Sequence, residues 1–265
     1  MYETHYHRAS SVSDAAKLIK KCDDGKLLSG GMTLIPTMKQ RLAAPSDLID
    51  LAHIAAMKGV KVSGKKVTIG AATTHAEVAG NEKLRSVCAA LADLASHIGD
   101  PHVRHRGTIG GSIANNDPAA DYPSAMLALD ATIVTDKRSI PADKFFKGLF
   151  ETSLKDGEIV TAIEFTAPAK AAYSKFPNPA SRYAMTGVFV SKQKDGARVA
   201  VTGAGDDGVF RHKGLEAALN KKFASDSLEG VAVASKGLMS DMHASADYRA
   251  ALIKVMAKRA VAAAG

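Results

Sequence analysis

Cysteine and aromatic residues are scarce in this sequence. Its 265 residues include two cysteines, Cys22 and Cys88, and no tryptophan. Four thiolates are the ordinary ligand set of an iron–sulfur cluster, and no Cys/His spacing here matches a zinc site. We therefore expect no metal ligands in this chain, and any metal chemistry belongs to a partner. With aromatics at 5%, the core must be built from aliphatic residues and methionine, which suits mixed helix and sheet packing.

Long apolar runs are also absent. No stretch approaches the ~18 apolar residues of a membrane span, and the opening MYETHYHRASSVSDAA lacks the apolar segment of a signal peptide. We expect a cytoplasmic protein without a transmembrane segment, its thiols reduced. A hydrophobic share of 46% suffices for one large domain, or for a large and a small one.

The formal net charge of +8 raises the question of nucleic-acid binding. The basic residues are scattered among acidic ones and are rarely interleaved with aromatics, so we expect no nucleic-acid partner. The densest basic stretch, HVRHR at residues 102–106, comes just before a glycine-rich segment. A bound phosphate or a solvated face would explain it equally well.

Hydrophobic periodicity predicts alternating strands and helices in the first part of the chain. We expect helices capped by Ser13 and near residues 34–42, 74–80, 82–98 and 122–129, and strands at 26–29, 46–51, 65–71 and 131–135. The segment GTIGGSIANNDPAAD, residues 107–121, has little of either period. It is polar and rich in glycine, which favours a ligand-binding loop.

The composition of the sequence changes at TAPAKAAYSKFPNPAS, which contains three prolines and has no apolar periodicity. A domain boundary is predicted near residue 167, giving domains 1–167 and 168–265. Beyond it we expect strands at 183–192 and 197–205, a short one near Val209, and helices at 215–222 and 247–264. The last helix is predicted to bury the face that carries Tyr248, Leu252, Val255 and Met256.

Two glycine pairs suggest where a ligand binds. Gly30-Gly31 lies between a predicted strand and a predicted helix, where backbone N–H groups favour a phosphate, although such a pair alone more often marks an ordinary turn. Gly110-Gly111 is accompanied by hydroxyl, amide and carboxyl side chains that would be costly to bury without partners. An Asx turn before the helix at Pro123 would explain Asp121 but not the whole polar string. Two such cradles could hold one extended dinucleotide.

A third glycine motif, Gly203-x-Gly205-x-x-Gly208, satisfies the dinucleotide-binding fingerprint by its letters. Asp206 and Asp207 would place carboxylates where a pyrophosphate must lie, and too little chain follows for a doubly wound sheet. A turn that ends a strand is the favoured interpretation.

Two long motifs of the sequence resemble those of a known protein family. The stretches LLSGGMTLIPTMKQRLAAPSDLIDL and IGDPHVRHRGTIGGSIANNDPAADYPSAMLALDATI strongly resemble the FAD-binding medium subunit of molybdenum hydroxylases, the carbon monoxide dehydrogenase and xanthine dehydrogenase group. DGEIVTAIEF, YSKF, VAVTGAG and DMHASADYRAAL extend the likeness over nearly the whole chain. The resemblance implies an α+β protein: a two-part FAD-binding domain of the vanillyl alcohol oxidase type, then a small C-terminal domain with a short antiparallel sheet and helices.

The resemblance also implies the residues that bind FAD. They are Ser29, Gly30, Gly31, Met32, Thr33, Leu34, Ile98, Thr108, Ile109, Gly110, Gly111, Ser112, Asn115, Asn116, Asp117, Asp121, Ile159, Val160 and Lys175. Family members usually carry Gln, His or Arg at position 32 and Ser at 33. Met32 cannot donate a hydrogen bond, so that one side-chain contact is in doubt, whereas backbone contacts survive the change.

The implied function is electron transfer. In these assemblies a large subunit with the molybdenum cofactor hydroxylates the substrate, a small subunit carries two [2Fe–2S] clusters, and the FAD of the medium subunit passes electrons to an acceptor. We expect a dimer of such heterotrimers and no catalytic acid–base residue in this chain, because the cofactor performs the redox chemistry. The hydroxylated substrate and the acceptor (NAD, quinone, cytochrome or oxygen) stay open. The alternatives are a self-contained flavoprotein oxidase and a nucleotide-binding module without a redox role.

Overall fold

The computed structural model describes residues 1–265, which form four β-sheets of 3, 5, 4 and 2 strands. The first sheet is parallel: β1 (His5–Arg8) and β2 (Gly25–Leu28) both pair with β3 (Asp47–Asp50). Helices α1 (Val12–Ile19) and α2 (Leu34–Lys39) make the crossovers that parallel neighbours require. All three strands therefore end at one edge, where the loop after β2 begins.

The second sheet is antiparallel, in the order β4-β5-β10-β6-β7. Its strands are β4 (Val60–Ser63), β5 (Lys66–Gly70), β10 (Val160–Thr166), β6 (Thr132–Thr135) and β7 (Ser139–Pro141). A short helix η1 (Ala55–Met57) precedes β4, and after β7 come α8 (Ala142–Phe145) and the hairpin of β8 (Phe146–Gly148) and β9 (Glu151–Thr152). Strand β10 thus returns to the centre of a sheet begun about 100 residues earlier.

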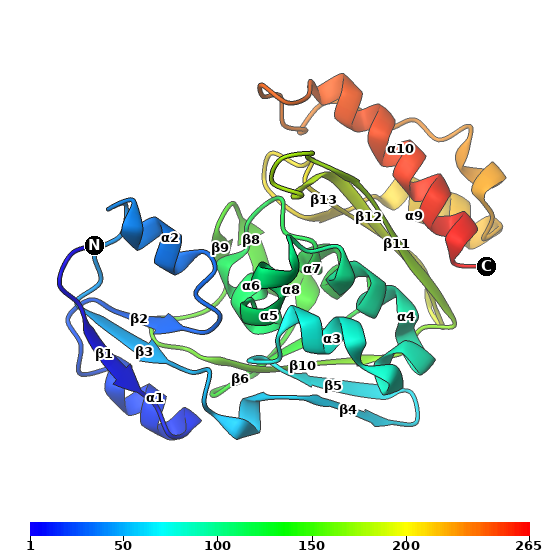
Figure 1. Cartoon of the computed structure of the whole chain (residues 1–265). Helices are drawn as coiled ribbons and strands as arrows, with labels where there is room; N and C mark the ends of the chain where they lie inside the picture. The colour runs from blue at the N-terminus through cyan, green and yellow to red at the C-terminus, as the bar shows by residue number, and fades with distance from the viewer.

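Five helices lie between this sheet and the four-stranded sheet (Figure 1). They are α3 (His75–Gly80), α4 (Glu82–Ser96), α5 (Pro101–Arg106), α6 (Ile109–Asn115) and α7 (Tyr122–Ala128). Helix α4 packs against β11, and α7 packs against β12 and β13. Together with the first two sheets these helices enclose a core of 37 buried apolar residues.

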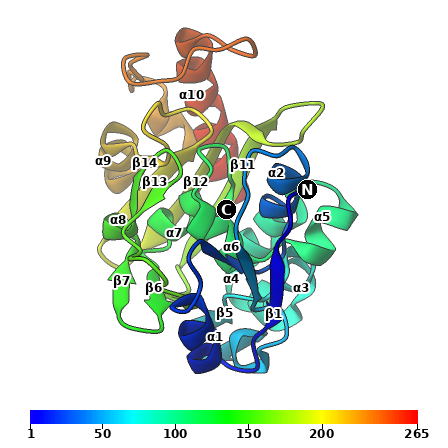
Figure 2. The same cartoon turned by 90° about the vertical axis from the view of Figure 1, so that its left-hand side faces the viewer.

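The four-stranded sheet is an antiparallel meander of β11 (Lys170–Pro177), β12 (Ala184–Gln193), β13 (Gly196–Thr202) and β14 (Phe210–Arg211). Helices α9 (Lys213–Lys221), η2 (Ser225–Leu228) and α10 (Ala246–Ala263) follow it, and α10 stands above this sheet, at the end of the molecule opposite α1 (Figure 2). Val188, Phe189 and Val190 of β12 are all fully buried: Phe189 belongs to the large core and its neighbours to a second core of 15 residues. Coverage on both faces explains the continuous apolar run of β12. None of the helices has the length and apolarity that a membrane crossing requires.

Several segments differ from the predictions. Residues 107–121 contain the helix α6, which the glycines and asparagines of the segment disguise because they are poor helix formers. The basic stretch before it forms α5, with Asp100 as N-cap and Pro101 in the first turn. The proline-rich stretch contains β11, whose proline lies at its last residue, where a strand tolerates it.

Two details of the helices were also predicted wrongly. Helix α1 is capped by Ser11, whose hydroxyl accepts from the Asp14 N–H, and not by Ser13. In α10, Tyr248 and Val255 are 46% and 41% exposed, and the buried face carries Arg249 and Ile253 beside the predicted Leu252 and Met256. The prediction left Arg249 out of the buried face because an arginine, even when buried, adds nothing to the apolar pattern of the sequence. The strands and helices predicted elsewhere are present, including α4, which has a non-helical kink at Cys88.

Strand β13 holds the loop before α7 in place. The buried Thr202 hydroxyl donates to the carbonyls of Pro118 and Ala120, at 3.1 and 2.6 Å, and the Gly203 N–H donates to Pro118 at 2.8 Å. Gly203 has φ +77°, and its carbonyl accepts from the guanidinium of Arg249 at 2.6 Å. The GAGDDG segment is therefore a turn that ends a strand and anchors the segment from Asp117 to Asp121.

We predict that Thr202→Val lowers the free energy of unfolding by about 1–3 kcal/mol, because an isosteric apolar group leaves the Ala120 carbonyl buried without its donor. Chemical denaturation measures the change. The matched control is Thr166→Val at the exposed end of β10, expected to stay within about 0.5 kcal/mol of wild type. Equal effects of the two substitutions would contradict the role of the Thr202 hydroxyl.

Candidate functional site

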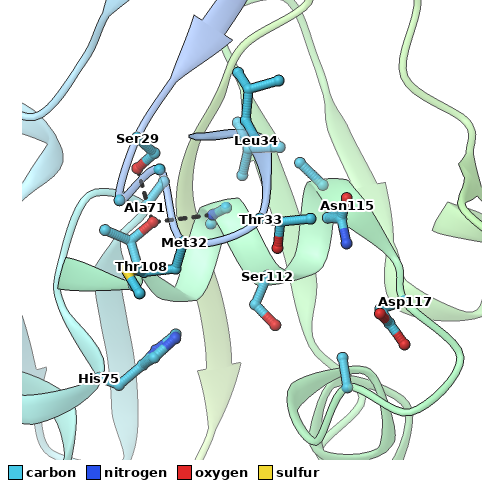
Figure 3. Close-up of a pocket in the computed structure, with 18 of the residues that line it drawn as sticks. Ser29, Met32, Thr33, Leu34, Ala71, His75, Thr108, Ser112, Asn115 and Asp117 are labelled. Carbon is cyan, nitrogen blue, oxygen red and sulfur yellow. Dashed lines mark hydrogen bonds between the residues drawn. The ribbon is translucent and has the colours of Figure 1, made fainter. Parts of the chain in front are cut away.

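A cavity of about 590 Å³ lies where the parallel sheet, α6 and the tip of the β11–β12 hairpin meet. Figure 3 shows Ser29, Thr33, Ser112 and Asn115 around it, contributed by the loop after β2 and by α6. A volume of this size is typical of a site for a sizeable small-molecule ligand. All but three of the predicted site residues line the cavity: Ile109, Asn116 and Lys175 do not.

The loop after β2 offers free backbone donors. Gly31 has φ +72°, in the left-handed region that favours glycine. Across Gly30, Gly31, Met32 and Thr33, no backbone N–H donates a hydrogen bond within the chain. Thr33 precedes α2 without a side-chain cap, so its hydroxyl is free as well. Consecutive unpaired N–H groups at the wall of a cavity form an environment that suits an anion.

The second glycine pair, Gly110-Gly111, differs in that its backbone N–H groups are bonded within the chain. The N–H groups of Ile109 and Gly110 donate to the Thr73 and Ala71 carbonyls, at 3.1 and 2.9 Å, and that of Gly111 donates to the Thr108 hydroxyl at 3.1 Å. A Cβ on Gly110 would lie 2.5 Å from the Ala71 Cβ. These glycines therefore let α6 pack against the end of β5. The first glycine pair therefore offers free backbone donors, whereas the second lines the cavity with its backbone N–H groups already bonded within the chain.

Side chains of α6 supply the polar contacts on this wall. The Ser112 hydroxyl and the Asn115 amide line the cavity and have no partner within the chain. Asn116, by contrast, ends α6 in the left-handed conformation, and its amide donates to the Gly148 and Glu151 carbonyls at 2.8 Å. Its role is structural: it ties α6 to the β8–β9 hairpin. Ile109 is fully buried in the core.

The two glycine segments touch directly. A Cβ on Gly30 would lie 2.2 Å from the Arg106 carbonyl oxygen, a distance that no side chain permits. The hydroxyls of Ser29 and Thr108, 79 residues apart in sequence, are 2.7 Å apart and hydrogen-bonded (Figure 3). The free donors of the first segment are thereby placed opposite the polar side chains of α6.

An ion pair closes one side of the cavity. The Asp121 carboxylate accepts from the Tyr173 hydroxyl at 2.5 Å and from the Lys175 ammonium at 3.0 and 3.2 Å, and Lys175 also donates to the His97 carbonyl. Burial raises the pKa of Asp121, and the ammonium beside it opposes that shift. Asp121 precedes α7 but does not cap it, so the Asx-turn interpretation is wrong for this residue. Asp117 makes such a turn, by accepting from the Ala119 N–H at 2.8 Å.

Lys175 therefore acts on the cavity through Asp121. It projects from β11 of the four-stranded sheet, whereas Asp121 lies on the loop before α7. The side chains of both are more than 90% buried, which favours a fixed pair over a mobile one. The pair joins the four-stranded sheet to the loop before α7 at the wall of the cavity.

Some lining residues escaped the sequence analysis. Ser181, Arg182 and Tyr183 come from the hairpin tip between β11 and β12, and Tyr183 is 46% exposed. Glu158 lines the cavity and binds the Arg138 guanidinium at 2.8 and 2.9 Å, which holds its pKa down at about 2. No local pattern marks these residues, since their placement depends on tertiary packing.

His75 was missed as well. It begins α3 after the capping box of Thr74 and Glu77, and its ring lies 5.4 Å from the ring of Tyr122. Figure 3 shows it below Thr108 at the edge of the cavity. Burial, with a contribution from the Arg104 charge, lowers the pKa of His75 to about 4, so the imidazole is neutral at pH 7.

This shift makes stability depend on pH. The unfolded chain, with a His pKa of 6.5, binds more protons than the folded chain between pH 6.5 and about 4, so stability falls as the pH falls through that window. We predict that His75 lowers the free energy of unfolding by ~3 kcal/mol as the pH falls from 6.5 to about 4. The variant His75→Gln should lack this contribution. Chemical denaturation across the window should show the difference between wild type and variant shrinking on acidification. Parallel curves would contradict a buried neutral His75.

Comparisons with known proteins agree with this geometry. A family model described as "FAD binding domain in molybdopterin dehydrogenase" matches residues 2–168. The carbon monoxide dehydrogenase medium chain of Hydrogenophaga pseudoflava is 34% identical and aligns over 98% of this chain and 96% of its own. The nicotine 6-hydroxylase medium subunit of Paenarthrobacter nicotinovorans is 32% identical, with coverage of 98% and 96%.

Solved structures show the same relationship. A carbon monoxide dehydrogenase structure from Hydrogenophaga pseudoflava superposes with a TM-score of 0.90 at 34% identity, covering 99% of this chain and 97% of that one. Quinoline 2-oxidoreductase from Pseudomonas putida 86 gives 0.88 at 26% identity, with coverage of 98% and 96%. The predicted resemblance is confirmed: this chain belongs to the FAD-binding medium subunits of the molybdenum hydroxylases, a family of oxidoreductase subunits, and FAD is its cofactor.

Proposed function

We propose that this chain takes electrons from a [2Fe–2S] subunit and passes them through FAD to an external acceptor. Bound FAD supplies the redox chemistry, and the protein supplies binding and orientation. The observation that carries the proposal is the run of unpaired N–H groups from Gly30 to Thr33 at the wall of the cavity. Its chemistry fits the pyrophosphate of a dinucleotide.

The other wall suits the uncharged polar parts of the cofactor. Ser112 and Asn115 face the cavity with unpaired hydroxyl and amide groups, and Thr33 adds a hydroxyl opposite them (Figure 3). Such groups donate to and accept from ribose and ribityl hydroxyls. Met32 offers only its backbone N–H and an apolar side chain that is 38% exposed. The predicted FAD-binding residues that line the cavity are proposed in that role.

Both proposed domains contribute residues to the cavity and its surroundings. The chain divides into residues 1–167 and 168–265, the latter a C-terminal domain of the carbon monoxide dehydrogenase flavoprotein type. Lys175 and the hairpin tip with Arg182 and Tyr183 come from the second domain. The cavity lies at their junction, a common place for cofactor sites.

The chain does not hold clusters of its own. Its two cysteines, Cys22 and Cys88, are fewer than the four thiolates that an iron–sulfur cluster ordinarily takes. The relatives are named medium chains or medium subunits. We propose as partners a small [2Fe–2S] subunit and a large molybdenum-cofactor subunit, in a dimer of heterotrimers.

The first test addresses FAD binding. Gly31→Val forces a branched residue into the left-handed region at a cost of about 1–2 kcal/mol, and we predict a loss of FAD affinity of at least about 10-fold. Fluorescence titration of flavin-free protein measures it, and FAD should bind more tightly than FMN, which lacks the pyrophosphate. Gly230→Val is the matched control, because a Cβ there meets nothing within 4 Å. Equal affinities for FAD and FMN would overturn the proposed pyrophosphate site.

The second test addresses electron transfer. We predict that the chain alone retains FAD but that substrate does not reduce its flavin until the iron–sulfur and molybdenum subunits are added. Stopped-flow absorbance follows flavin bleaching in the assembled complex and in a mixture without the iron–sulfur subunit. Rapid bleaching of the lone chain by substrate would favour a self-contained flavoprotein oxidase instead.

A further inference from the structure

The parallel sheet carries a second cluster of chemically reactive side chains, away from the cavity. His7 lies on β1, Cys22 follows α1, and Asp47 begins β3. Their candidate ligand atoms, one imidazole nitrogen, one sulfur and one carboxylate oxygen, all lie within 4.8 Å of one another. Sequence spacing did not reveal the cluster, because its members come from three separate elements.

Strand pairing explains why these residues meet. Strand β1 runs parallel to β3 with His5 opposite Asp47, so His7 lies on the same face of the sheet, two residues further along. Gly25, at the start of β2, is also paired with Asp47. A Cβ on Gly25 would lie 2.8 Å from the Cβ of Cys22, so β2 and the turn that carries Cys22 are in close contact.

We propose that His7, Cys22 and Asp47 form a structural binding site for one zinc ion, with water as the fourth ligand. Thiolate, imidazole and carboxylate are all zinc ligands, and a set that combines sulfur with nitrogen favours zinc over magnesium or calcium. Tetrahedral zinc separates its ligand atoms by roughly 3.3–3.7 Å. His7 Nε2 and Asp47 Oδ1 are closer than this, at 2.6 Å, so the two side chains must separate by about 1 Å when zinc binds.

The surroundings prepare these ligands. His7 Nε2 lies 2.6 Å from Asp47 Oδ1, and the Ser46 hydroxyl donates to Asp47 Oδ2 at 2.6 Å, which leaves Oδ1 as a single ligand oxygen. The Ser46 hydrogen bond orients the Asp47 ligand, whereas the His7–Asp47 hydrogen bond joins two of the ligand atoms and is replaced when zinc binds between them. The side chains of His7 and Asp47 are 34% and 15% exposed, so an ion and its water have access.

Charge balance favours the ion. A thiolate at Cys22 and the carboxylate of Asp47 would bring two negative charges together, and a divalent cation between them balances both. Zinc binding releases the thiol proton of Cys22, and His7 binds through Nε2 with its ring proton on Nδ1. The ion would then join the turn after α1 to β1 and β3, at the end of the sheet opposite the Gly30 loop.

Metal content is the first test. We expect the full-length FAD-loaded chain, stripped with a chelator and then dialysed against zinc, to retain one zinc ion by mass spectrometry of the metal. Cys22→Ser and His7→Gln should each weaken zinc binding at least about 10-fold in chelator competition. Cys88→Ser and His53→Gln are the matched controls, because one removes the other cysteine and the other removes a histidine of the same region outside the cluster.

Cobalt gives an independent measurement. Substitution of zinc by Co²⁺ should produce a thiolate-to-metal charge-transfer band in the difference spectrum against the metal-free holoprotein. The band should disappear in Cys22→Ser and persist in Cys88→Ser. Absence of the band in wild type, or zinc binding that is equal in the cluster variants and their controls, would overturn the proposal. If Cys22→Ser fails to fold, the charge-transfer band of the wild type and the zinc affinity of His7→Gln still test the proposed site.

Discussion

The contact between Gly30 and the Arg106 carbonyl is the constraint on which the site depends. A Cβ on Gly30 would lie only 2.2 Å from the Arg106 carbonyl oxygen, so the backbones of two segments far apart in sequence meet without a side chain between them. The Ser29–Thr108 hydrogen bond fixes their register. Since β2 ends at one segment and α6 begins at the other, this contact joins the parallel sheet to the helices above the antiparallel sheet. The shape of the cavity follows from it.

Glycines in the site serve three separate purposes, which the sequence could not distinguish. Gly30 and Gly110 remove Cβ atoms where backbone or Ala71 approaches, Gly31 supplies a left-handed φ, and Gly111 places its N–H on the Thr108 hydroxyl. Only the segment from Gly30 onward leaves N–H groups free. A glycine pair in a sequence therefore marks a close approach without saying whether a ligand or the protein itself is the neighbour.

Much of the fold was predictable where one face of an element is buried. Helix α4 and strands β2, β3, β5 and β6 follow their apolar periods, and the long motifs identified the family. Prediction failed where composition and tertiary packing disagree: α6 holds two glycines, ends at Asn115 and is followed by Asn116 as its C-cap, and β11 ends in a proline. His75, Glu158 and Tyr183 reach the cavity through packing of distant segments, so no local signal identifies them. Lys175 was predicted from the motif YSKF, but its contact with Asp121 required the structure.

The hydrogen bonds from Thr202 to Pro118 and Ala120 have a consequence for the order of events during synthesis. The loop that carries Asp117 and Asp121 is fixed by a strand made more than 80 residues later. While that strand is still inside the ribosome, the loop lacks the donors that fix it. This side of the cavity is therefore complete only after the C-terminal sheet has emerged and docked.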